Sequence, residues 1–385
     1  MLTVLIASDK FKGSLTAAQV ADAVGAGVRR ARPDVHVESV PVADGGDGTV
    51  AAALAAGFQL VPVVASGPTG EPVHTGFARS ADVAVVEMAD VAGLVRLPGG
   101  IPAPLTSSSR GVGEVVAAAV AAGCRTVLLG IGGSASTDGG AGLLAGLGAR
   151  LLDGNGVPVP DGGAALTRIA SIDLAAVGEL MDGVHLVLAS DVDNPLTGPA
   201  GAAAVYGPQK GASSEEVREL DDALTHFADI IAATTGVDHR CHAGAGAAGG
   251  TGFAALAVLG AEFRPGVALV LELVGFDDRV SDADLVVTGE GALDEQTLHG
   301  KAPAGVAAAA RAAGVPVVAV CGRNLLTAEA LRAAGIAAAY ALTDIEPDVA
   351  RCLAEPVPLL VRLGELIATD HLSAEGRPIQ IRGRR

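Results

Sequence analysis

A hydrophobic run that leads directly into a glycine-rich loop constrains the fold of this chain more than any other feature. Residues 126–131 are mostly β-branched or leucine, as in a buried strand. The loop that follows, Gly132-Gly-Ser-Ala-Ser-Thr-Asp138, contains glycines that reach backbone angles other residues avoid and that let N–H groups approach a ligand. A helix beginning near Asp138 would add free N–H groups that favour phosphate or carboxylate. The stretch therefore predicts a strand, a tight loop and a helix.

Asp138 leaves two interpretations of this loop open. A carboxylate repels a neighbouring phosphate unless a cation lies between them, so the pairing points to a metal-bound nucleotide. An ordinary strand-to-helix turn with a capping aspartate gives the same sequence. A single glycine-rich loop does not decide between these interpretations.

The same order of strand, polar loop and helix recurs along the chain. The carboxyl ends of strands in an open α/β sheet are where ligands bind, so the loops at these ends are candidate binding segments. Turn formation and helix capping also explain aspartates there, and this alternative stays open. The predicted strands, each with the loop that follows it, are 2–7 with 8–14, 35–42 with 43–49, 184–190 with 191–196, and 284–288 with 289–301.

The predicted strands indicate an α/β fold built from two domains. Two strand–helix units at the N-terminus and three strands with helices after about residue 280 complete a five-stranded, doubly wound parallel sheet of flavodoxin-like kind. The middle of the chain is then an inserted second α/β domain. We assign residues 1–65 and 282–385 to the first domain and 66–281 to the second, and we expect the active site in the cleft between them.

Composition excludes several classes of protein. The 385 residues are 50% hydrophobic, enough to bury a sizeable core, and the net charge of −17 argues against nucleic acid and anionic membranes as partners. We find no export signal and no uninterrupted apolar segment long enough to span a membrane, so the cytoplasm is the expected location. The four cysteines form no C-x-x-C pair, which favours reduced thiols. A homodimer is left open, and the basic tail 377–385 receives no function.

Lysine is scarce, and its positions are informative. The chain has 26 lysines and arginines, of which only four are lysines, namely Lys10, Lys12, Lys210 and Lys301. All four lie in loop-like segments, whereas surface helices carry arginine. Because a lysine ammonium is a compact point charge for phosphate or carboxylate, we interpret these four as candidate anion-binding groups. Chance combined with solubility is the competing explanation.

Seven segments together resemble the bacterial glycerate kinase family, which is unrelated to the P-loop and protein kinases. They occur in the family's order and cover about residues 2–342. The segments are Asp9-Lys-Phe-Lys-Gly-Ser-Leu15, Ala43-Asp-Gly-Gly-Asp-Gly-Thr49, Gly130-Ile-Gly-Gly-Ser-Ala-Ser-Thr-Asp-Gly-Gly140, Asp191-Val-Asp-Asn-Pro-Leu196, Gly207-Pro-Gln-Lys-Gly211, Gly244-Ala-Gly-Ala-Ala-Gly-Gly250, and Thr288-Gly-Glu-Gly291 with Gly300-Lys301.

The resemblance implies phosphorylation of D-glycerate with ATP and Mg²⁺. It also implies a flavodoxin-like domain interrupted by one similar to restriction-endonuclease folds, and it favours 2-phosphoglycerate over 3-phosphoglycerate as the product. The chain departs from the family pattern at Ser8-Asp9-Lys10, where many members have Pro-Asp-Ser, and at Cys321-Gly-Arg-Asn324. Neither departure changes the acidic and lysine positions in the seven segments.

Residue chemistry suggests roles for the candidate site residues within this framework. Phosphoryl transfer needs cations on the phosphate oxygens and a positioned nucleophile. We expect Asp191 as the base, with Lys12, Lys210 and Lys301 as catalytic cations. The other expected sets are Gly132, Gly133, Ser134, Gly249 and Gly250 for nucleotide phosphates, Lys12, Asp44, Asn194 and Gln296 for substrate, and Asp44, Asp138 and Glu290 for metal.

Two functions from other classes remain open at this stage. A nicotinamide-dependent dehydrogenase would use Gly130–Gly133, but this segment lacks G-x-G-x-x-G spacing and a suitably placed acid. The cluster Ala243–Gly252 superficially resembles a dinucleotide fingerprint but follows no clear strand, so its glycines are better explained by close approach of a helix or ligand. A non-catalytic protein that closes two lobes on an anion is the other alternative, and it leaves the acidic loop residues without a role.

Overall fold

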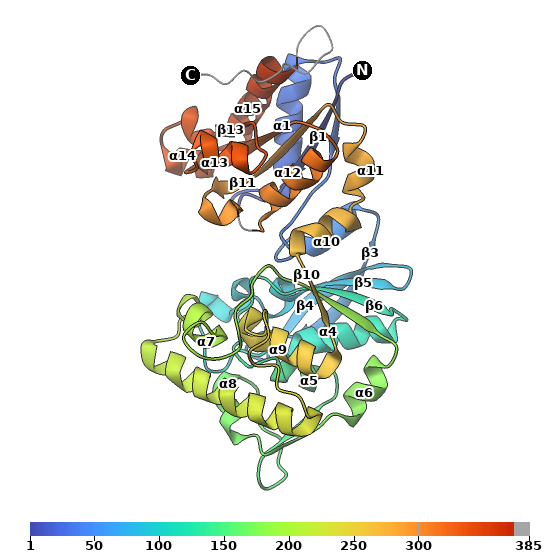
Figure 1. Ribbon diagram of the computed structural model, residues 1–385, viewed down its shortest axis with the longest axis vertical. Helices are drawn as coiled ribbons and strands as arrows, with labels where there is room; N and C mark the ends of the chain where they lie inside the picture. Colours follow the sequence, from blue (N-terminus) through green and yellow to red (C-terminus); the bar gives the residue numbers. More distant parts are fainter. Residues whose placement is uncertain (299, 373–385) are drawn as a thin grey trace. The chain divides into compact units, whose positions relative to one another are not determined.

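The computed structural model describes residues 1–298 and 300–372 (Figure 1). The basic tail 377–385 lies outside the described residues. The chain divides into two compact units. Unit 1 contains residues 1–44, 51–56 and the chain from 267 onward, and unit 2 contains residues 45–50 and 57–266.

Unit 1 contains the five-stranded parallel sheet that the sequence predicts. The strand order is β13-β12-β11-β1-β2, and each neighbouring pair is parallel. The sheet is therefore made from the two ends of the chain. Its strands are β1 (Thr3–Ser8), β2 (His36–Ser39), β11 (Leu285–Leu293), β12 (Val317–Asn324) and β13 (Ala338–Ala341).

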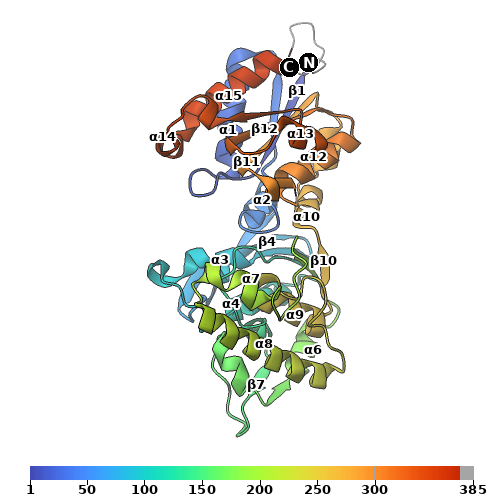
Figure 2. The same cartoon turned by 60° about the vertical axis from the view of Figure 1, so that its left-hand side comes forward.

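Both faces of this sheet are covered by helices, because side chains alternate between two cores along β1. Val4 and Ile6 pack with α1 and α15 on one face, whereas Leu5 and Ala7 pack with α10 and α12 on the other. Figures 1 and 2 show α1 beside α15. The helices are α1 (Ala17–Ala31), α2 (Thr49–Ala55), α10 (Gly266–Leu273), α11 (Phe276–Val280), α12 (Ala302–Ala312), α13 (Ala328–Ala333), α14 (Val349–Ala354) and α15 (Pro356–His371).

Unit 2 is built on a mixed six-stranded sheet of order β10-β9-β6-β5-β4-β3. The strands β5, β6, β9 and β10 run parallel, and β3 and β4 add an antiparallel edge. The strand β7 lies outside this sheet and pairs with β8 instead. The bounds are β3 (Gln59–Ser66), β4 (Pro72–Ser80), β5 (Val83–Glu87), β6 (Thr126–Gly130), β7 (Arg150–Leu152), β8 (Ser171–Asp173), β9 (His185–Ala189) and β10 (Glu262–Arg264).

One large core holds unit 2 together, and the long helix α8 contributes to it as its sequence predicts. Ser213 and Glu216 form a capping box, and Leu220, Leu224 and Phe227 are fully buried. The Nε2–H of His226 donates to the Ile169 carbonyl oxygen at 2.7 Å, which is a structural role. The helices are α3 (Met88–Ala92), α4 (Arg110–Ala121), α5 (Ala141–Gly146), α6 (Ala175–Met181), α7 (Ala202–Tyr206), α8 (Ser214–Thr235) and α9 (Ala247–Leu259).

The boundaries between the units differ from the predicted 65/66 and 281/282. Strand β3 pairs along its whole length with β4, so residues 59–65 belong to unit 2. Helices α10 and α11 bury Val270 and Phe276 in the core of the five-stranded sheet, so residues 267–281 belong to unit 1. Sequence patterns locate strands and helices, whereas the unit to which each belongs depends on contacts distant in the chain.

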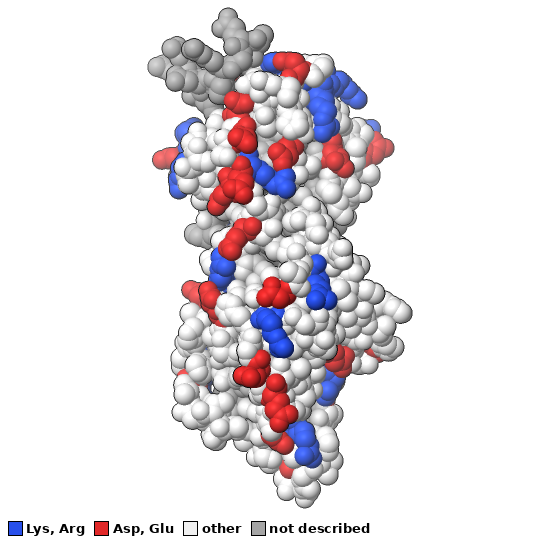
Figure 3. All heavy atoms as spheres, turned by 90° about the vertical axis from the view of Figure 1, so that its right-hand side faces the viewer, with Lys and Arg blue, Asp and Glu red and all other residues white. Residues whose placement is uncertain are grey.

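Surface charge and helix hydropathy describe the exterior of the chain. On the face shown in Figure 3, acidic and basic side chains are interspersed, without a single-sign basic patch. Among the described residues, no helix is both long enough and apolar enough to cross a bilayer. The four cysteines are free thiols, as their spacing predicts.

The contact between α1 and α15 gives a test of the unit 1 packing. A Cβ at Gly27 would lie 1.9 Å from the carbonyl oxygen of Val361, so Gly27→Ala forces the two helices apart. We expect a loss of about 1–3 kcal/mol in the free energy of unfolding of unit 1, measured by calorimetry. The matched control is Gly178→Ala in α6, where a Cβ meets nothing within 4 Å. It should stabilise unit 2 by about 0.5–1 kcal/mol, and equal losses in both variants would contradict this packing argument.

Candidate functional site

Two glycine-rich segments of unit 2 pack against each other backbone to backbone. A Cβ at Gly249 would lie 2.0 Å from the Ser136 carbonyl oxygen, and one at Gly250 would lie 2.7 Å from Cα of Gly139. The N–H of Gly139 donates to the Gly249 carbonyl oxygen at 2.9 Å. Both Gly249 and Gly250 are buried and have positive φ. These glycines therefore permit the close approach of α9 to the loop 132–140. The sequence suggested close helix approach for this cluster, beside phosphate binding.

A third glycine-rich segment lies against the start of the same loop. A Cβ at Gly130 would lie 2.5 Å from the carbonyl oxygen of Gly45, and one at Gly132 would lie 2.7 Å from Cα of Gly46. The Thr49 hydroxyl donates to the Gly46 carbonyl oxygen at 2.7 Å and holds the turn. Residues 45–50, 130–140 and 244–252 thus form one cluster of close backbone contacts, which we call the glycine cluster.

Asp138 fixes the loop from within the glycine cluster. Asp138 is 1% exposed, and its carboxylate accepts hydrogen bonds from five donors. The donors are the N–H groups of Ser109, Gly140 and Gly142 and the hydroxyls of Ser108 and Ser109, at 2.8–3.2 Å. Burial raises the pKa of Asp138, and these hydrogen bonds oppose the rise. The predicted helix start is wrong by a few residues, because Gly140 is the N-cap and α5 begins at Ala141.

Lys210 lies beneath the loop and is itself buried. Its Nζ donates to the Ser134 hydroxyl at 2.9 Å and to the Ser136 carbonyl oxygen at 2.6 Å. Burial lowers the pKa of Lys210 to about 7, while the charge of Asp138 acts in the opposite direction. The short helical turn 208–210 and the left-handed Gly211 carry this lysine into the interior. Sequence reasoning identified Lys210 as an anion-binding cation, and the structure shows it holding Ser134 and Ser136.

Asp191 and Asn194 follow β9, at the carboxyl end of the sheet of unit 2. Asp191 is exposed, and its Oδ1 accepts a hydrogen bond from the N–H of Gly266 at 3.1 Å. The amide of Asn194 donates to the Ala200 carbonyl oxygen at 2.9 Å. Its backbone carbonyl accepts from the N–H of Gly246, which connects the segment to the glycine cluster.

Glu87 is a buried acid that the sequence analysis did not single out. It ends β5, pairs in register with Gly130, and accepts a hydrogen bond from the N–H of Val50 at 3.1 Å. Burial raises the pKa of Glu87 to about 7, with hydrogen bonds from the backbone lowering it and the charge of Asp47 raising it. Its position directly after a β-branched strand was the available signal, because an acid there lies at the binding edge of an α/β sheet.

Unit 1 gathers a separate group of acids and lysines at the carboxyl ends of β1 and β11. Glu290 is 8% exposed and accepts a short hydrogen bond from the Thr297 hydroxyl. The Lys301 Nζ lies 3.1 Å from the Glu290 carboxylate. Burial raises the pKa of Glu290, whereas Thr297 and Lys301 lower it. This places two of the predicted residues, Glu290 and Lys301, in direct contact.

Asp9 belongs to this group and was missed as a site residue. Burial raises its pKa to about 7. The charge of Lys10 opposes this shift, and the charges of Asp44 and Glu290 add to it. The N–H of Asp9 donates to the Gly289 carbonyl oxygen at 2.9 Å, so β1 and β11 hold Asp9 in place beside Glu290. The sequence signal was again an acid immediately after a buried strand, in the loop that carries the first two lysines.

The other predicted residues of unit 1 lie near this group but are more exposed. Lys12 is exposed, and its backbone nitrogen would lie 3.5 Å from a Cβ at Gly291. Gln296 is exposed, and its N–H donates to Asp294 Oδ1 at 2.9 Å. Asp44 is half-buried at the point where the chain passes from unit 1 to unit 2.

Unit 1 also has a buried hydroxyl beside its acids that lacks a partner. Thr288 Oγ1 has no hydrogen-bond partner among the described residues, and it precedes Glu290 by two positions on the same face of β11. An unpaired buried hydroxyl at a group of acids is a position that a polar ligand can satisfy. Within residues 1–298 and 300–372, no three histidines, cysteines or acids are arranged to hold a metal ion by themselves.

Comparison with known proteins agrees with this arrangement of segments. The model of the glycerate kinase family matches residues 4–371. The chain belongs to the glycerate kinase family. It is 44% identical over 344 residues to a glycerate kinase of Bacillus subtilis (strain 168), covering 89% of this chain and 90% of that relative. It is 42% identical over 325 residues to the glycerate 2-kinase of Escherichia coli (strain K12), covering 83% and 85%.

A solved structure supports the family membership of the whole fold. The chain resembles a crystal structure of a candidate glycerate kinase 2 from Salmonella typhimurium LT2, with a TM-score of 0.82 and 39% identity. The match covers 96% of this chain and 97% of that chain. The resemblance to the glycerate kinase family that the seven segments suggested is therefore confirmed, and so is the α/β class with parallel strands.

The Asp138 hydrogen bonds generate a first prediction for this glycerate kinase family member. Asp138→Asn replaces an acceptor oxygen by an NH₂ group that faces N–H donors, so we expect unit 2 to lose about 2–4 kcal/mol in denaturant unfolding. Asp153→Asn is the matched control. Both backbone hydrogen bonds to Asp153 end on Oδ1, which asparagine retains, so the loss should stay below about 0.5–1 kcal/mol. Comparable losses at the two positions would show that the buried carboxylate has no special role.

Glu87 generates a second prediction, with a defined pH dependence. Because burial raises its pKa from 4.5 to about 7, the folded protein keeps a proton that the unfolded chain loses, and stability falls as pH rises across this window. Glutamine mimics the protonated acid. We expect Glu87→Gln to gain up to about 3 kcal/mol at pH 8 and almost nothing at pH 4.5, measured by thermal unfolding.

Glu179→Gln is the control for this pH dependence, because Glu179 is an exposed glutamate on α6 of the same unit. It should change the unfolding free energy by less than about 0.5 kcal/mol at both pH values. A pH-independent effect of Glu87→Gln would contradict the raised pKa.

Proposed function

We propose that this protein transfers the γ-phosphoryl group of ATP to the 2-hydroxyl of D-glycerate and forms 2-phosphoglycerate, with Mg²⁺ assisting. Membership of the glycerate kinase family carries this proposal, and the relative named glycerate 2-kinase supports the position of the phosphate. The family membership also favours a kinase over the dehydrogenase and the non-catalytic binding protein. Formation of 3-phosphoglycerate is the alternative product.

In this proposal, the loop at Gly132, Gly133 and Ser134 binds nucleotide phosphate. Gly133 has a positive φ of 70°, and the loop follows the carboxyl end of β6, where N–H groups can face an anion. Lys210 and Asp138 are then positioning residues, because both are buried and their hydrogen bonds end on the loop and its supports. Gly249 and Gly250 contribute by holding the loop from behind. Because the loop is already ordered, phosphate binding costs less conformational entropy than it would with a flexible loop.

Charge neutralisation comes from the exposed and half-buried lysines. Lys12 and Lys301 are positioned to place ammonium groups on substrate carboxylate or phosphate oxygens, which carry developing charge during transfer. Glu290 orients Lys301 through their 3.1 Å contact. We further propose that Gln296 and Asn194 hydrogen bond to glycerate.

Asp44 and Glu290 are the acids that fit a magnesium ion best. Mg²⁺ in phosphoryl-transfer enzymes is held by one or two carboxylates and completed by phosphates and water, so a full cage of protein ligands is not required. The unpaired Thr288 hydroxyl beside Glu290 is consistent with a polar ligand there. Bound Mg²⁺ would supply positive charge to the phosphate oxygens. Asp138 fits a metal poorly, because it is 1% exposed and five protein donors already satisfy its carboxylate, whereas in the described part of the chain Glu290 accepts only from Thr297 and Lys301.

Asp191 is the proposed base for the glycerate hydroxyl. It is exposed at the carboxyl end of β9, and its Oδ1 is oriented by the N–H of Gly266. A base must lie within hydrogen-bond reach of the hydroxyl that it deprotonates, and the exposed, oriented carboxylate of Asp191 is accessible for this role.

For the fold, we propose that unit 1 is flavodoxin-like and that unit 2 is related to restriction-endonuclease folds. The first part is supported by the strand order β2-β1-β11-β12-β13, which matches the 2-1-3-4-5 order of flavodoxin.

Product analysis tests the proposed reaction directly. The purified protein is incubated with ATP, Mg²⁺ and D-glycerate, and the phosphorylated carbon is identified by ³¹P and ¹H NMR. We expect phosphate on C2 and no turnover without glycerate. Phosphate on C3 would replace the proposed product, and consumption of NAD(P)H or no ATP turnover at all would contradict the kinase proposal.

Removal of single ammonium groups tests the proposed cations. Lys12→Met and Lys301→Met should each lower kcat/KM by roughly 10²-fold or more if the lysine contacts the reacting phosphoryl group, because a preorganised charge is lost. Arg332→Met, at an exposed cation on α13 of the same unit, is the matched control and should leave kcat/KM within about twofold. Rates close to those of the unmodified protein in both lysine variants would remove the basis for their roles.

A further inference from the structure

A cavity in unit 2 lies among elements that the proposed reaction does not use. Its volume is about 240 Å³, and it is lined by the start of α4, by α5, by β7 and by the segment 158–169. An engineered cavity of about 150 Å³ is large enough to bind benzene, so this one has room for a molecule of roughly ten non-hydrogen atoms. Its size therefore suits a small organic molecule.

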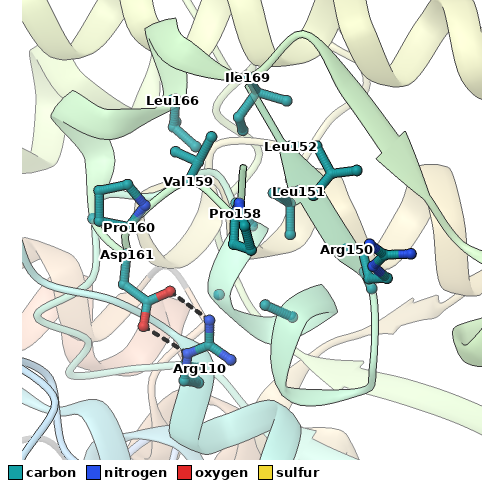
Figure 4. A pocket seen from close by; sticks show the side chains of 15 residues that line it. Arg110, Arg150, Leu151, Leu152, Pro158, Val159, Pro160, Asp161, Leu166 and Ile169 are labelled. Atoms are coloured by element: carbon teal, nitrogen blue, oxygen red, sulfur yellow. Dashed lines mark hydrogen bonds and ion pairs between the residues drawn. The ribbon is translucent and has the colours of Figure 1, made fainter. Parts of the chain in front are cut away.

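The lining of this cavity is apolar between two charged positions, as Figure 4 shows. Leu151, Pro158 and Val159 form the apolar part. On one side, Arg110 makes a bidentate ion pair with Asp161, with distances of 2.6 and 2.8 Å. This pair is electrically balanced and already satisfied.

Arg150 provides the unbalanced charge at the cavity. Its side chain lies on the other side of the apolar residues from the Arg110–Asp161 pair (Figure 4). Arg150 is exposed, and its backbone pairs with Asp173 in the β7–β8 ladder, but its side chain makes no hydrogen bond or ion pair to the other described residues. A guanidinium beside an apolar cavity matches a ligand with a carboxylate head and a hydrocarbon body, since the planar fork binds carboxylate through two N–H groups.

The cavity wall is also connected to the loop that we propose for phosphate binding. The N–H of Gly142 donates directly to Asp138 at 3.1 Å. The N–H of Arg110 donates to the Ser108 hydroxyl at 3.1 Å, and this hydroxyl donates to Asp138 at 3.0 Å. Two lining residues are therefore within two hydrogen bonds of the carboxylate that fixes the loop. Any change that an occupant makes to α5 or to the start of α4 acts on this loop.

We propose that this cavity is a regulatory site for a small carboxylate with an apolar body of about six to nine carbon atoms. The carboxylate binds Arg150, and the hydrocarbon part fills the space beside Leu151 and Val159. Occupation of the site changes the affinity of the loop 132–138 for nucleotide, and by thermodynamic linkage nucleotide changes the affinity of the site to the same extent. This second part rests on the proposed kinase function, whereas binding of the carboxylate does not.

Binding is tested on the full chain by amide NMR titration with cyclohexanecarboxylate and with the neutral, isosteric cyclohexanecarboxamide. We expect shifts at the lining residues, a Kd on the order of 1 mM or below for the carboxylate, and binding of the amide weaker by about fivefold to tenfold. Arg150→Gln should remove this preference, and the matched control Arg168→Gln, at an exposed arginine outside the lining, should keep it. Ala145→Phe, which fills the cavity, should weaken both ligands more than tenfold.

The proposal is overturned if neither ligand shifts the lining residues at 10 mM, or if carboxylate and amide bind equally well to the unmodified protein. It is also overturned if Arg168→Gln abolishes the preference as fully as Arg150→Gln does. The regulatory part is tested separately by the KM for ATP at saturating cyclohexanecarboxylate. A change that Arg150→Gln abolishes supports coupling, and an unchanged KM in a protein that binds the carboxylate overturns it. These titrations need no enzymatic turnover, so failure of the kinase proposal would be seen independently.

Discussion

Close backbone contact between glycine-rich segments is the constraint on which the architecture of unit 2 depends. Residues 45–50, 130–140 and 244–252 approach so closely that a Cβ at Gly130, Gly132 or Gly249 would overlap backbone atoms of a neighbouring segment. This contact leaves no room for side chains, so the loop must be held by buried polar groups instead. Asp138 and Lys210 supply these groups. A loop made of small residues is thereby held in place by the protein around it.

The two units use different chemistry for their candidate groups. In unit 2, the acid and the lysine nearest the loop are buried and make hydrogen bonds to the protein, which suits them for positioning. In unit 1, Asp9 and Glu290 are also buried, but Lys301, which contacts Glu290, is half-buried and reaches solvent. Ligands can therefore reach the group in unit 1 more directly. This contrast explains why residues of the same type in similar glycine-rich loops are given different roles.

The sequence predicted the elements well because local patterns determine them. The five strands of unit 1, the capping boxes of α1 and α8 and the free cysteines follow from alternation, capping residues and spacing. The unit boundaries did not follow, since β3 and α10 belong to units through contacts with residues distant in sequence.

For the same reason, the sequence could not distinguish a metal ligand from a buried hydrogen-bond acceptor at Asp138. Its donors Ser108 and Ser109 lie about thirty residues earlier in the chain. The acids Asp9 and Glu87 became notable only when their burial was known.

The central claim is that the loop 132–138, held by its glycine contacts and by Asp138, binds the phosphates of ATP. Amide hydrogen exchange measured with and without a non-hydrolysable ATP analogue and Mg²⁺ tests this claim most directly. We expect the analogue to slow exchange in peptides covering 131–138, and we expect little change in peptides of the distant edge strand β3. Unchanged exchange in the loop, under conditions where binding of the analogue is saturated, would contradict the account.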